Sequence, residues 1–242
     1  MIQLAIETSS RIGSIALVDG EHTLAQRSST PERGHGRFIL REVNEVLQQA
    51  DIQLADVDVF VANIGPGSFT GVRVGLACAR ALSWSLSRPV AGADGMDSLA
   101  HCVSIANSAY VSPVLDARKG EVYGALYERT ASGLQCVLEP RAMPPSQWES
   151  LVRSYASDAA VQYVGDGVPL LSSDSVGLDL AISAAALAAS ARRYFALHGR
   201  WCEAIPRYVR AAEAEVKFGA APEHAPLKSL VRADSYRRDT SE

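Results

Sequence analysis

The sequence has few residues that could build a disulfide framework or a metal centre. Its four cysteines form no Cys-x-x-Cys pair, and we interpret all of them as buried, reduced thiols: Cys78, Cys102, Cys136 and Cys202. No two of its five histidines are close in sequence, although a helical pair of histidine ligands normally stands four residues apart. The sequence therefore argues against a disulfide-stabilised domain, and it gives no support to a histidine-based metal site.

Long apolar runs and an excess of basic residues are also missing. No stretch approaches the roughly 18 uninterrupted apolar residues of a membrane span, and the opening MIQLAIETSS does not resemble a secretory leader. The net charge of −4 and the pI near 5.8 argue against a protein that holds nucleic acid alone through a broad basic surface. We therefore expect a cytoplasmic protein without a membrane contact, one that would need a partner to engage RNA.

The stretch from Val57 to Ser87 is the best-defined part of the chain. A run of branched and aromatic residues predicts a strand over 57–64 that is buried on both faces, and Gly65-Pro66-Gly67-Ser68 predicts a tight turn before a helix over 69–87. A nucleotide-binding P-loop would need Gly-Lys-Ser/Thr at the start of this helix. Because Phe69-Thr70-Gly71 stands there instead, the P-loop interpretation fails.

Small residues recur every four positions on the predicted helix, at Gly71, Gly75 and Ala79. Each glycine inside a helix costs about 1 kcal/mol relative to alanine, so this smooth face needs a reason. Two explanations stay open at this point. The face packs closely inside the chain, or it receives a partner.

The order of predicted elements repeats once along the chain. In each half three strands are followed by a helix, a strand and a further helix, with the second series covering strands over 110–115, 121–128, 133–143 and 161–164 and helices over 148–155 and 178–197. This plan predicts an α/β protein with the two-lobed actin/Hsp70/sugar-kinase-like fold, built from duplicated ribonuclease-H-like βββαβα halves with mixed sheets. We place the N-terminal lobe at 1–108, a smaller C-terminal lobe at 109–205 with its last helix packing back on the first lobe, and a charged, partly disordered tail at 206–242.

Two hairpin loops and a glycine turn are placed to bind a nucleotide in such a fold. The candidate residues are Thr8 and Ser9 in the first loop, Asp116 and Arg118 in the second, and Gly165 and Gly167 beside an adenosine. The chemistry fits less well than the layout, because Glu7-Thr8-Ser9 has no glycine in the turn and a longer acid than ATP-hydrolysing members of the fold carry. Each loop alone could equally be a plain hairpin.

Five segments together resemble one family, and they occur in its order across nearly the whole chain to about Arg210. These are LAIETSS (4–10), IGPGSFTGVRVG (64–75), DARKGEVYGALY (116–127), VGDG (164–167) and PRYVR (206–210). On these segments the chain is identified as a member of the TsaB family, also called YeaZ.

The resemblance implies a non-catalytic scaffold and activator subunit for tRNA modification. Such proteins pair with TsaD, which transfers the threonylcarbamoyl group to N6 of the adenosine 3′ to the anticodon in tRNAs reading codons that begin with A, and TsaE is a third component. The implied interface uses helices over 34–50 and 69–87, with these residues: His35, Phe38, Gly71, Val72, Gly75, Leu76 and Ala79. A homodimer through the same helices is expected as a resting state, and tRNA is contacted only through the complex.

The resemblance also concerns metal and nucleotide. The catalytic paralogue holds a metal through a His-x-x-x-His pair, and the matching positions here are Asp94 and Ser98, so we expect no metal and no catalytic residue. We expect this chain to bind no cofactor by itself. The resemblance leaves one role for a nucleotide, which is ATP or ADP at the interface with TsaD. Two alternatives remain: an independent ATPase or small-molecule kinase of the actin-like fold, and a metallopeptidase.

Overall fold

The first of two mixed sheets is built from five strands in the N-terminal part of the chain, between residues 2 and 94. The computed structural model describes residues 1–30, 39–103, 108–175 and 177–210. Strands β1 (Ile2–Glu7), β2 (Gly13–Asp19) and β3 (His22–Ser29) pair antiparallel, while β4 (Val59–Gly65) and β5 (Val90–Asp94) run parallel to β1, in the order β3-β2-β1-β4-β5. All seven residues of β4 are buried, so the predicted strand with two dry faces is confirmed.

The second sheet repeats this topology. Its strands are β6 (Tyr110–Arg118), β7 (Glu121–Thr130), β8 (Gly133–Met143), β9 (Val161–Val164) and β10 (Gly177–Leu178), in the order β10-β9-β6-β7-β8. Here β6, β7 and β8 pair antiparallel and β9 runs parallel to β6, as β4 does to β1. The predicted fold class, two ribonuclease-H-like halves with mixed sheets, is confirmed.

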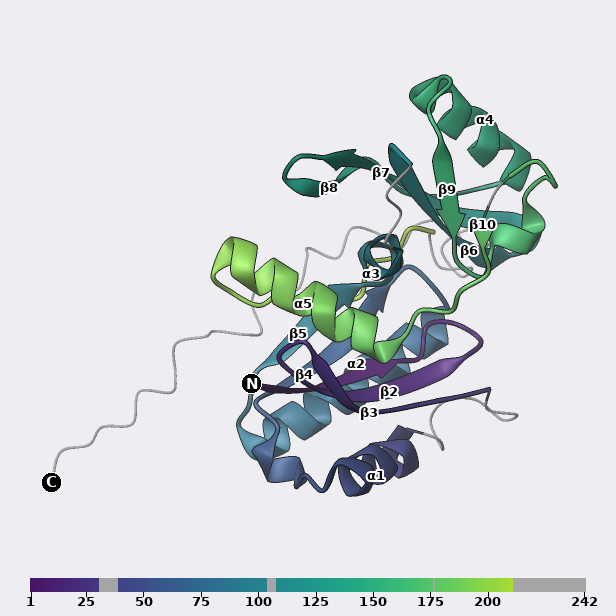
Figure 1. Ribbon diagram of the computed structural model, residues 1–242. Helices are drawn as coiled ribbons and strands as arrows, with labels where there is room; N and C mark the ends of the chain where they lie inside the picture. Colours follow the sequence, from purple (N-terminus) through teal and green to yellow (C-terminus); the bar gives the residue numbers. More distant parts are fainter. Residues whose placement is uncertain (31–38, 104–107, 176, 211–242) are drawn as a thin grey trace, which may run out of the picture. The chain divides into compact units, whose positions relative to one another are not determined.

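Five α-helices in the described residues cover the sheets (Figure 1). Helices α1 (Ile39–Ala50) and α2 (Phe69–Leu86) pack on one face of the first sheet, and α3 (Gly95–Cys102) and α5 (Ala184–His198) share a core with its other face and with the second sheet. Helix α4 (Pro145–Ala156) covers the remaining face of the second sheet. Short 3-10 turns occupy Leu54–Asp56 and Val168–Leu170.

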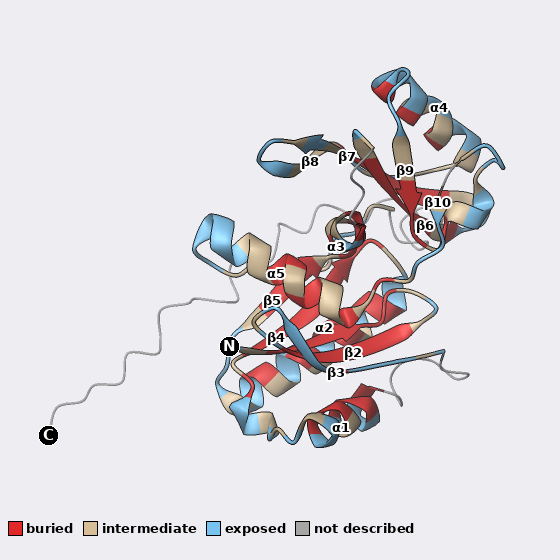
Figure 2. Cartoon of the chain, in the orientation of Figure 1, coloured by how far each residue is buried: buried red, intermediate tan, exposed pale blue. Residues whose placement is uncertain are grey.

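Buried residues continue across the first sheet from β2 (Figure 2) to β1, along which successive side chains point to opposite faces of the sheet. Leu4 and Ile6 point into the core beneath α1 and α2, whereas Ala5 points into the core that contains α5. The small side chain of Ala5 suits this side, because α5 is itself rich in alanine where it contacts β1. The strand therefore turns its large apolar residues toward α1 and α2, whereas Ala5 and the polar Gln3, whose Nε2 donates to the Ala188 carbonyl, face α5.

One predicted helix begins later than expected. The helix was predicted over 178–197, but Leu178 belongs to the two-residue strand β10 and α5 starts at Ala184. Ser183 is its N-cap, with the hydroxyl accepting a hydrogen bond from the Ala186 N–H at 3.1 Å. Gly199 ends the helix in the left-handed conformation, as the His198-Gly199 pair predicted.

Residues Met1–Arg210 cluster as one compact unit, and α5 contacts β1, β2, β4 and β5 of the first sheet. The lobe boundaries near 108 and 205 stay predictions. His35 and Phe38, as well as the tail from 211, lie outside the described residues. Within the described part, no helix is both long enough and apolar enough to cross a membrane.

Candidate functional site

The smooth face of α2 is turned into the chain's own core. A Cβ atom added at Gly71 would lie 1.9 Å from the Thr8 carbonyl oxygen, and one added at Gly75 would lie 2.4 Å from Thr8 Oγ1. All five residues that we assigned to a partner surface on this helix are buried: Gly71, Val72, Gly75, Leu76 and Ala79. Internal packing, one of the two explanations that the sequence left open, accounts for the small residues. We therefore correct their assignment, because these residues are not available to a partner in this structure.

The exposed face of α2 carries a different set of residues. Arg73, Ala77, Ala81 and Trp84 follow one another at helical spacing and are all exposed, and Trp84 has 86% of its surface accessible. On α1, Leu40 is 63% exposed. Because Ala77 and Ala81 have small side chains, a partner helix could approach the backbone of α2 closely in the middle of this exposed stripe.

The first hairpin loop is closed by the chain's own carboxylate. One oxygen of Glu7 accepts hydrogen bonds from the Ser9 N–H (2.6 Å), the Ser9 hydroxyl (2.7 Å) and the Ser10 N–H (3.0 Å), and the other accepts from Asn63 Nδ2 (2.6 Å). Glu7 is fully buried, and burial raises its pKa although these donors act in the opposite direction. The Ser9 and Ser10 N–H groups are therefore already hydrogen-bonded to the Glu7 carboxyl group rather than available to a phosphate. Thr8 also points inward, because its hydroxyl donates to the Gly71 carbonyl at 2.7 Å.

The second hairpin and the glycine turn lie together. Arg118 pairs with the Asp116 carboxylate at 3.0 Å, and the Asp116 N–H donates to Asp166 Oδ1 at 3.1 Å. Gly167 donates to the Val114 carbonyl at 3.0 Å, and a Cβ at Gly165 would lie 2.1 Å from that same oxygen. The predicted nucleotide residues thus form two groups. Asp116, Arg118, Gly165 and Gly167 adjoin one another in the second half, while Thr8 and Ser9 are engaged in the first.

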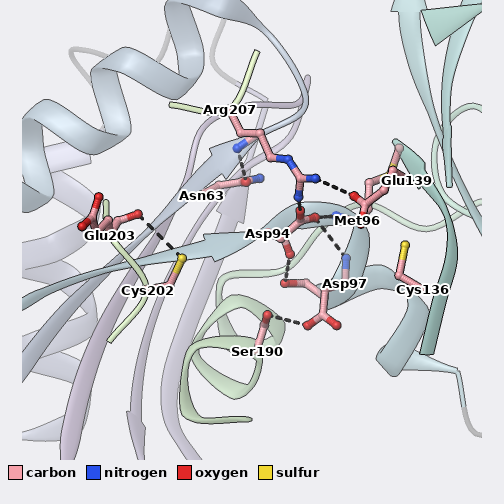
Figure 3. Close-up of polar contacts among 12 residues, drawn as sticks. Asn63, Asp94, Met96, Asp97, Cys136, Glu139, Ser190, Cys202, Glu203 and Arg207 are labelled. Carbon is pink, nitrogen blue, oxygen red and sulfur yellow. Dashed lines mark hydrogen bonds and ion pairs between the residues drawn. The ribbon is translucent and has the colours of Figure 1, made fainter. Parts of the chain in front are cut away.

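Asp94 organises the start of α3 (Figure 3). Its Oδ1 accepts hydrogen bonds from the N–H groups of Met96 (2.7 Å) and Asp97 (3.2 Å), so it caps the helix, and the Ser98 hydroxyl donates to the Asp94 carbonyl at 2.7 Å. The other carboxylate oxygen lies 2.9 Å from Arg207. Burial raises the pKa of Asp94, while the N–H donors and the Arg207 charge lower it. Over the part of the chain that the structure describes, no group of three or more His, Cys, Asp or Glu side chains is arranged to hold a metal.

Two contributors to these sites were missed by sequence reasoning. Asn63 hydrogen-bonds Glu7, and the signal for it was a polar residue inside an otherwise apolar buried strand. Arg207 joins Asp94 to Glu139 of β8, at 2.9 and 2.5 Å. It stands in the PRYVR segment (206–210), which was predicted to belong to a charged tail.

Comparisons with known proteins agree along most of the chain. Residues 22–223 match the family model described as TsaD: tRNA N6-adenosine threonylcarbamoyltransferase. The tRNA threonylcarbamoyladenosine biosynthesis protein TsaB of Bacillus subtilis is 30% identical over 231 residues, which is 90% of this chain and 98% of that protein. The protein of the same name from Escherichia coli is 34% identical over 144 residues, 57% of this chain and 62% of its own length. The solved structure of YeaZ from Pseudomonas aeruginosa, 25% identical, superposes with a TM-score of 0.68 over 86% of this chain and 99% of that one.

Proposed function

This chain belongs to the TsaB family, and from that membership we propose that it is a non-catalytic subunit in the biosynthesis of threonylcarbamoyladenosine in tRNA. The biosynthetic process itself follows from its homologues, which are named for it. The proposal concerns the role of this chain within the process. In it, the chain activates TsaD by binding to it and contributes no acid, base or nucleophile to the transfer.

One observation carries the non-catalytic role. The positions that match the metal-binding histidine pair of the catalytic paralogue are Asp94 and Ser98, and both are engaged within this chain. A serine hydroxyl that donates to a carbonyl and a carboxylate that caps a helix and pairs with Arg207 do not form the donor set of that metal. No step of the transfer is therefore assigned to these residues.

We place the TsaD contact on the exposed face of α2, together with the adjoining surface of α1. Exposed Trp84 offers a large apolar side chain of the kind that anchors protein interfaces, and Ala77 and Ala81 leave room beside it. The same surface would pair two copies of this chain when TsaD is absent. TsaE and tRNA join through the complex, in the cytoplasm, and the acidic net charge of −4 is consistent with indirect contact to tRNA.

The proposal includes no cofactor bound by this chain alone. Because the Ser9 and Ser10 N–H groups are bound to Glu7, the first hairpin does not fit the phosphates of a nucleotide in this arrangement. ATP or ADP at the interface with TsaD would then be held mainly by TsaD. No contact among the described residues favours the alternative of an independent ATPase or kinase.

A transfer assay tests the proposed role. Unmodified tRNA and threonylcarbamoyl-adenylate are incubated with this chain, with TsaD and TsaE, or with all three proteins, and the modified nucleoside is measured by mass spectrometry. The proposal predicts no product from the chain alone and the highest yield from the complete mixture. Product from the chain alone would overturn the non-catalytic role.

A further inference from the structure

The segment over 201–210 runs along the first half of the molecule after α5 ends. The Gly92 N–H of β5 donates to the Cys202 carbonyl at 2.9 Å, and the Arg207 N–H donates to the Ile64 carbonyl at the end of β4 at 2.7 Å. Glycines provide the space for this approach. A Cβ at Gly92 would lie 2.5 Å from the Glu203 carbonyl oxygen, and one at Gly65 would lie 2.7 Å from the Arg207 carbonyl oxygen.

Arg207 links the two sheets through its side chain. One guanidinium nitrogen lies 2.9 Å from Asp94, at the end of β5 in the first sheet, and another lies 2.5 Å from Glu139 in β8 of the second sheet (Figure 3). Glu139 is 68% exposed, so that ion pair alone contributes little to stability. The ion pair matters here because it joins the segment over 201–210 to β8 of the second sheet.

Tyr208 attaches the segment to the first turn of α2. Its hydroxyl accepts a hydrogen bond from Arg73 Nε at 2.7 Å, and its ring centroid lies 4.9 Å from that of Phe69. Arg73 in turn lies over the Phe69 ring, 3.5 Å from its centroid. Three side chains from two distant parts of the chain therefore form one stack at the start of α2.

Arg210 reaches the second hairpin. It donates to the Ala117 carbonyl at 3.1 Å and forms an ion pair with Glu121, while Val209 packs against the core between the sheets. Within four consecutive residues, the segment thus contacts the β5–α3 junction, the start of α2, the central core and the β6–β7 hairpin.

We propose that residues 201–210 form a clasp that couples the first turn of α2, in the first half, to the hairpin over 116–121, in the second. Because the anchors at Arg207, Tyr208 and Arg210 are adjacent in sequence, loss of one leaves the backbone between the others less constrained. The clasp thus has a docked and a released arrangement, and each end is more stable when the other is docked. Any ligand that orders the hairpin would by the same linkage order the start of α2, and the reverse. This coupling does not depend on the proposed function.

Hydrogen exchange of the full chain tests the clasp, with Arg210→Ala as the main variant. We expect exchange to become about fivefold faster or more in the hairpin over 116–121 and also in the peptide over 65–74, which Arg210 does not contact. Arg200→Ala, an exposed arginine just before the clasp, is the matched control and should change neither region. Faster exchange confined to the hairpin would overturn the proposal.

A second variant tests the coupling in the opposite direction, from the start of α2 to the hairpin. Tyr208→Phe removes only the hydroxyl that accepts from Arg73, so this mild change should leave the protection of α4 at its wild-type level. The clasp predicts faster exchange in the hairpin over 116–121 as well as at the start of α2. Unchanged exchange in the hairpin would contradict it, and this arm decides the question if Arg210→Ala loses protection throughout the chain, including α4.

Discussion

The carboxylate of Asp97 joins helix α3 to helix α5. Its carboxylate in α3 accepts hydrogen bonds from Ser190 Oγ at 2.6 Å and Arg193 at 2.8 Å, both in α5, and lies 3.2 Å from His101 Nδ1. Burial alone would raise the pKa of Asp97, but His101, Arg193 and Ser190 outweigh it and lower the pKa below its ordinary value. The ionised carboxylate therefore stabilises the folded state.

Asp97→Asn should lower the free energy of unfolding at pH 7 by about 1–3 kcal/mol, the range for a hydrogen-bonded charged group. Because the folded pKa is depressed, this contribution is complete above the unfolded pKa of about 4 and disappears as the pH falls through the lower folded value. Urea unfolding of wild type and variant between pH 7 and pH 3 measures it. Asp158→Asn, at an exposed carboxylate, is the control. A difference between wild type and Asp97→Asn that stays constant down to pH 3 would contradict the assignment.

Two effects of opposite sign act on the stability of the Gly71→Ala variant. Helix propensity favours Gly71→Ala by about 1 kcal/mol, but the new Cβ would lie 1.9 Å from the Thr8 carbonyl oxygen, which is backbone. Overpacking typically costs about 1–3 kcal/mol, and we expect at least the upper end of this range because the neighbouring atom is backbone, so the net loss in the free energy of unfolding should be about 2 kcal/mol. Chemical denaturation measures the change. Ala77→Gly, on the exposed face of the same helix, should lose only the propensity of about 1 kcal/mol. A stabilised Gly71→Ala protein would show that the stripe is not packed as described.

At the scale of elements, one side chain attaches α4 to the second sheet. Trp148 is fully buried against β7, where Gly124 leaves room for its ring, since a Cβ there would lie 2.3 Å from the indole. The indole N–H donates to Ser112 Oγ at 3.1 Å, and Ser112 is fully buried as well. Packing and one internal hydrogen bond therefore act at the same place.

Trp148→Phe should cost about 2 kcal/mol of stability, because it removes ring volume and leaves the Ser112 hydroxyl without that donor. A double-mutant cycle with Ser112→Ala separates the two contributions. In the Ser112→Ala background, the cost of Trp148→Phe should fall by about 1 kcal/mol. Additive effects would show that the hydrogen bond contributes nothing measurable.

Helices and strands were predictable from the sequence where a long stretch followed the hydrophobic pattern of a single kind of element. The strand over 57–64, the helix over 69–87 and the repeated order of strands and helices were of this kind, and each is present. The late start of α5 was not predictable, because the two-residue strand β10 is too short to show a period and Ala-rich sequence extends the helical pattern across it. Glycines at spacing four on α2 fitted internal packing and a partner equally well, and only the position of Thr8 distinguishes them.

The candidate site was harder to predict because it depends on contacts across long sequence separations. Glu7 was recognised as a poor match to an ATP-hydrolysing loop, but that its carboxylate binds Ser9, Ser10 and Asn63 requires the pairing of β1 with β4. Arg207 lies 113 residues from Asp94, so no local pattern could connect them. Charge and proline in the final segment suggested a solvated tail, whereas residues up to Arg210 belong to the compact unit.

At the scale of the whole molecule, the layers leave the outer side of α1 and α2 exposed. Helices α3 and α5 share a core with both sheets, and α4 covers the outer face of the second sheet, while α2 and α1 cover the first sheet and keep their far side exposed. The proposed role requires this far side to bind TsaD. A test of this role also requires that the fold of the chain survive a substitution on this side.

The most direct test is light scattering coupled to size-exclusion chromatography, on this chain mixed with TsaD, using Ala77→Arg. Ala77 is exposed in the middle of α2, so arginine there would block a close helix contact while leaving the core intact. Ala196→Arg makes the same change at an exposed alanine of α5 and is the matched control. The account predicts a mixed complex with wild type and with Ala196→Arg, and its loss with a folded Ala77→Arg. A complex that persists in Ala77→Arg, or no complex with the wild-type chain, would contradict it.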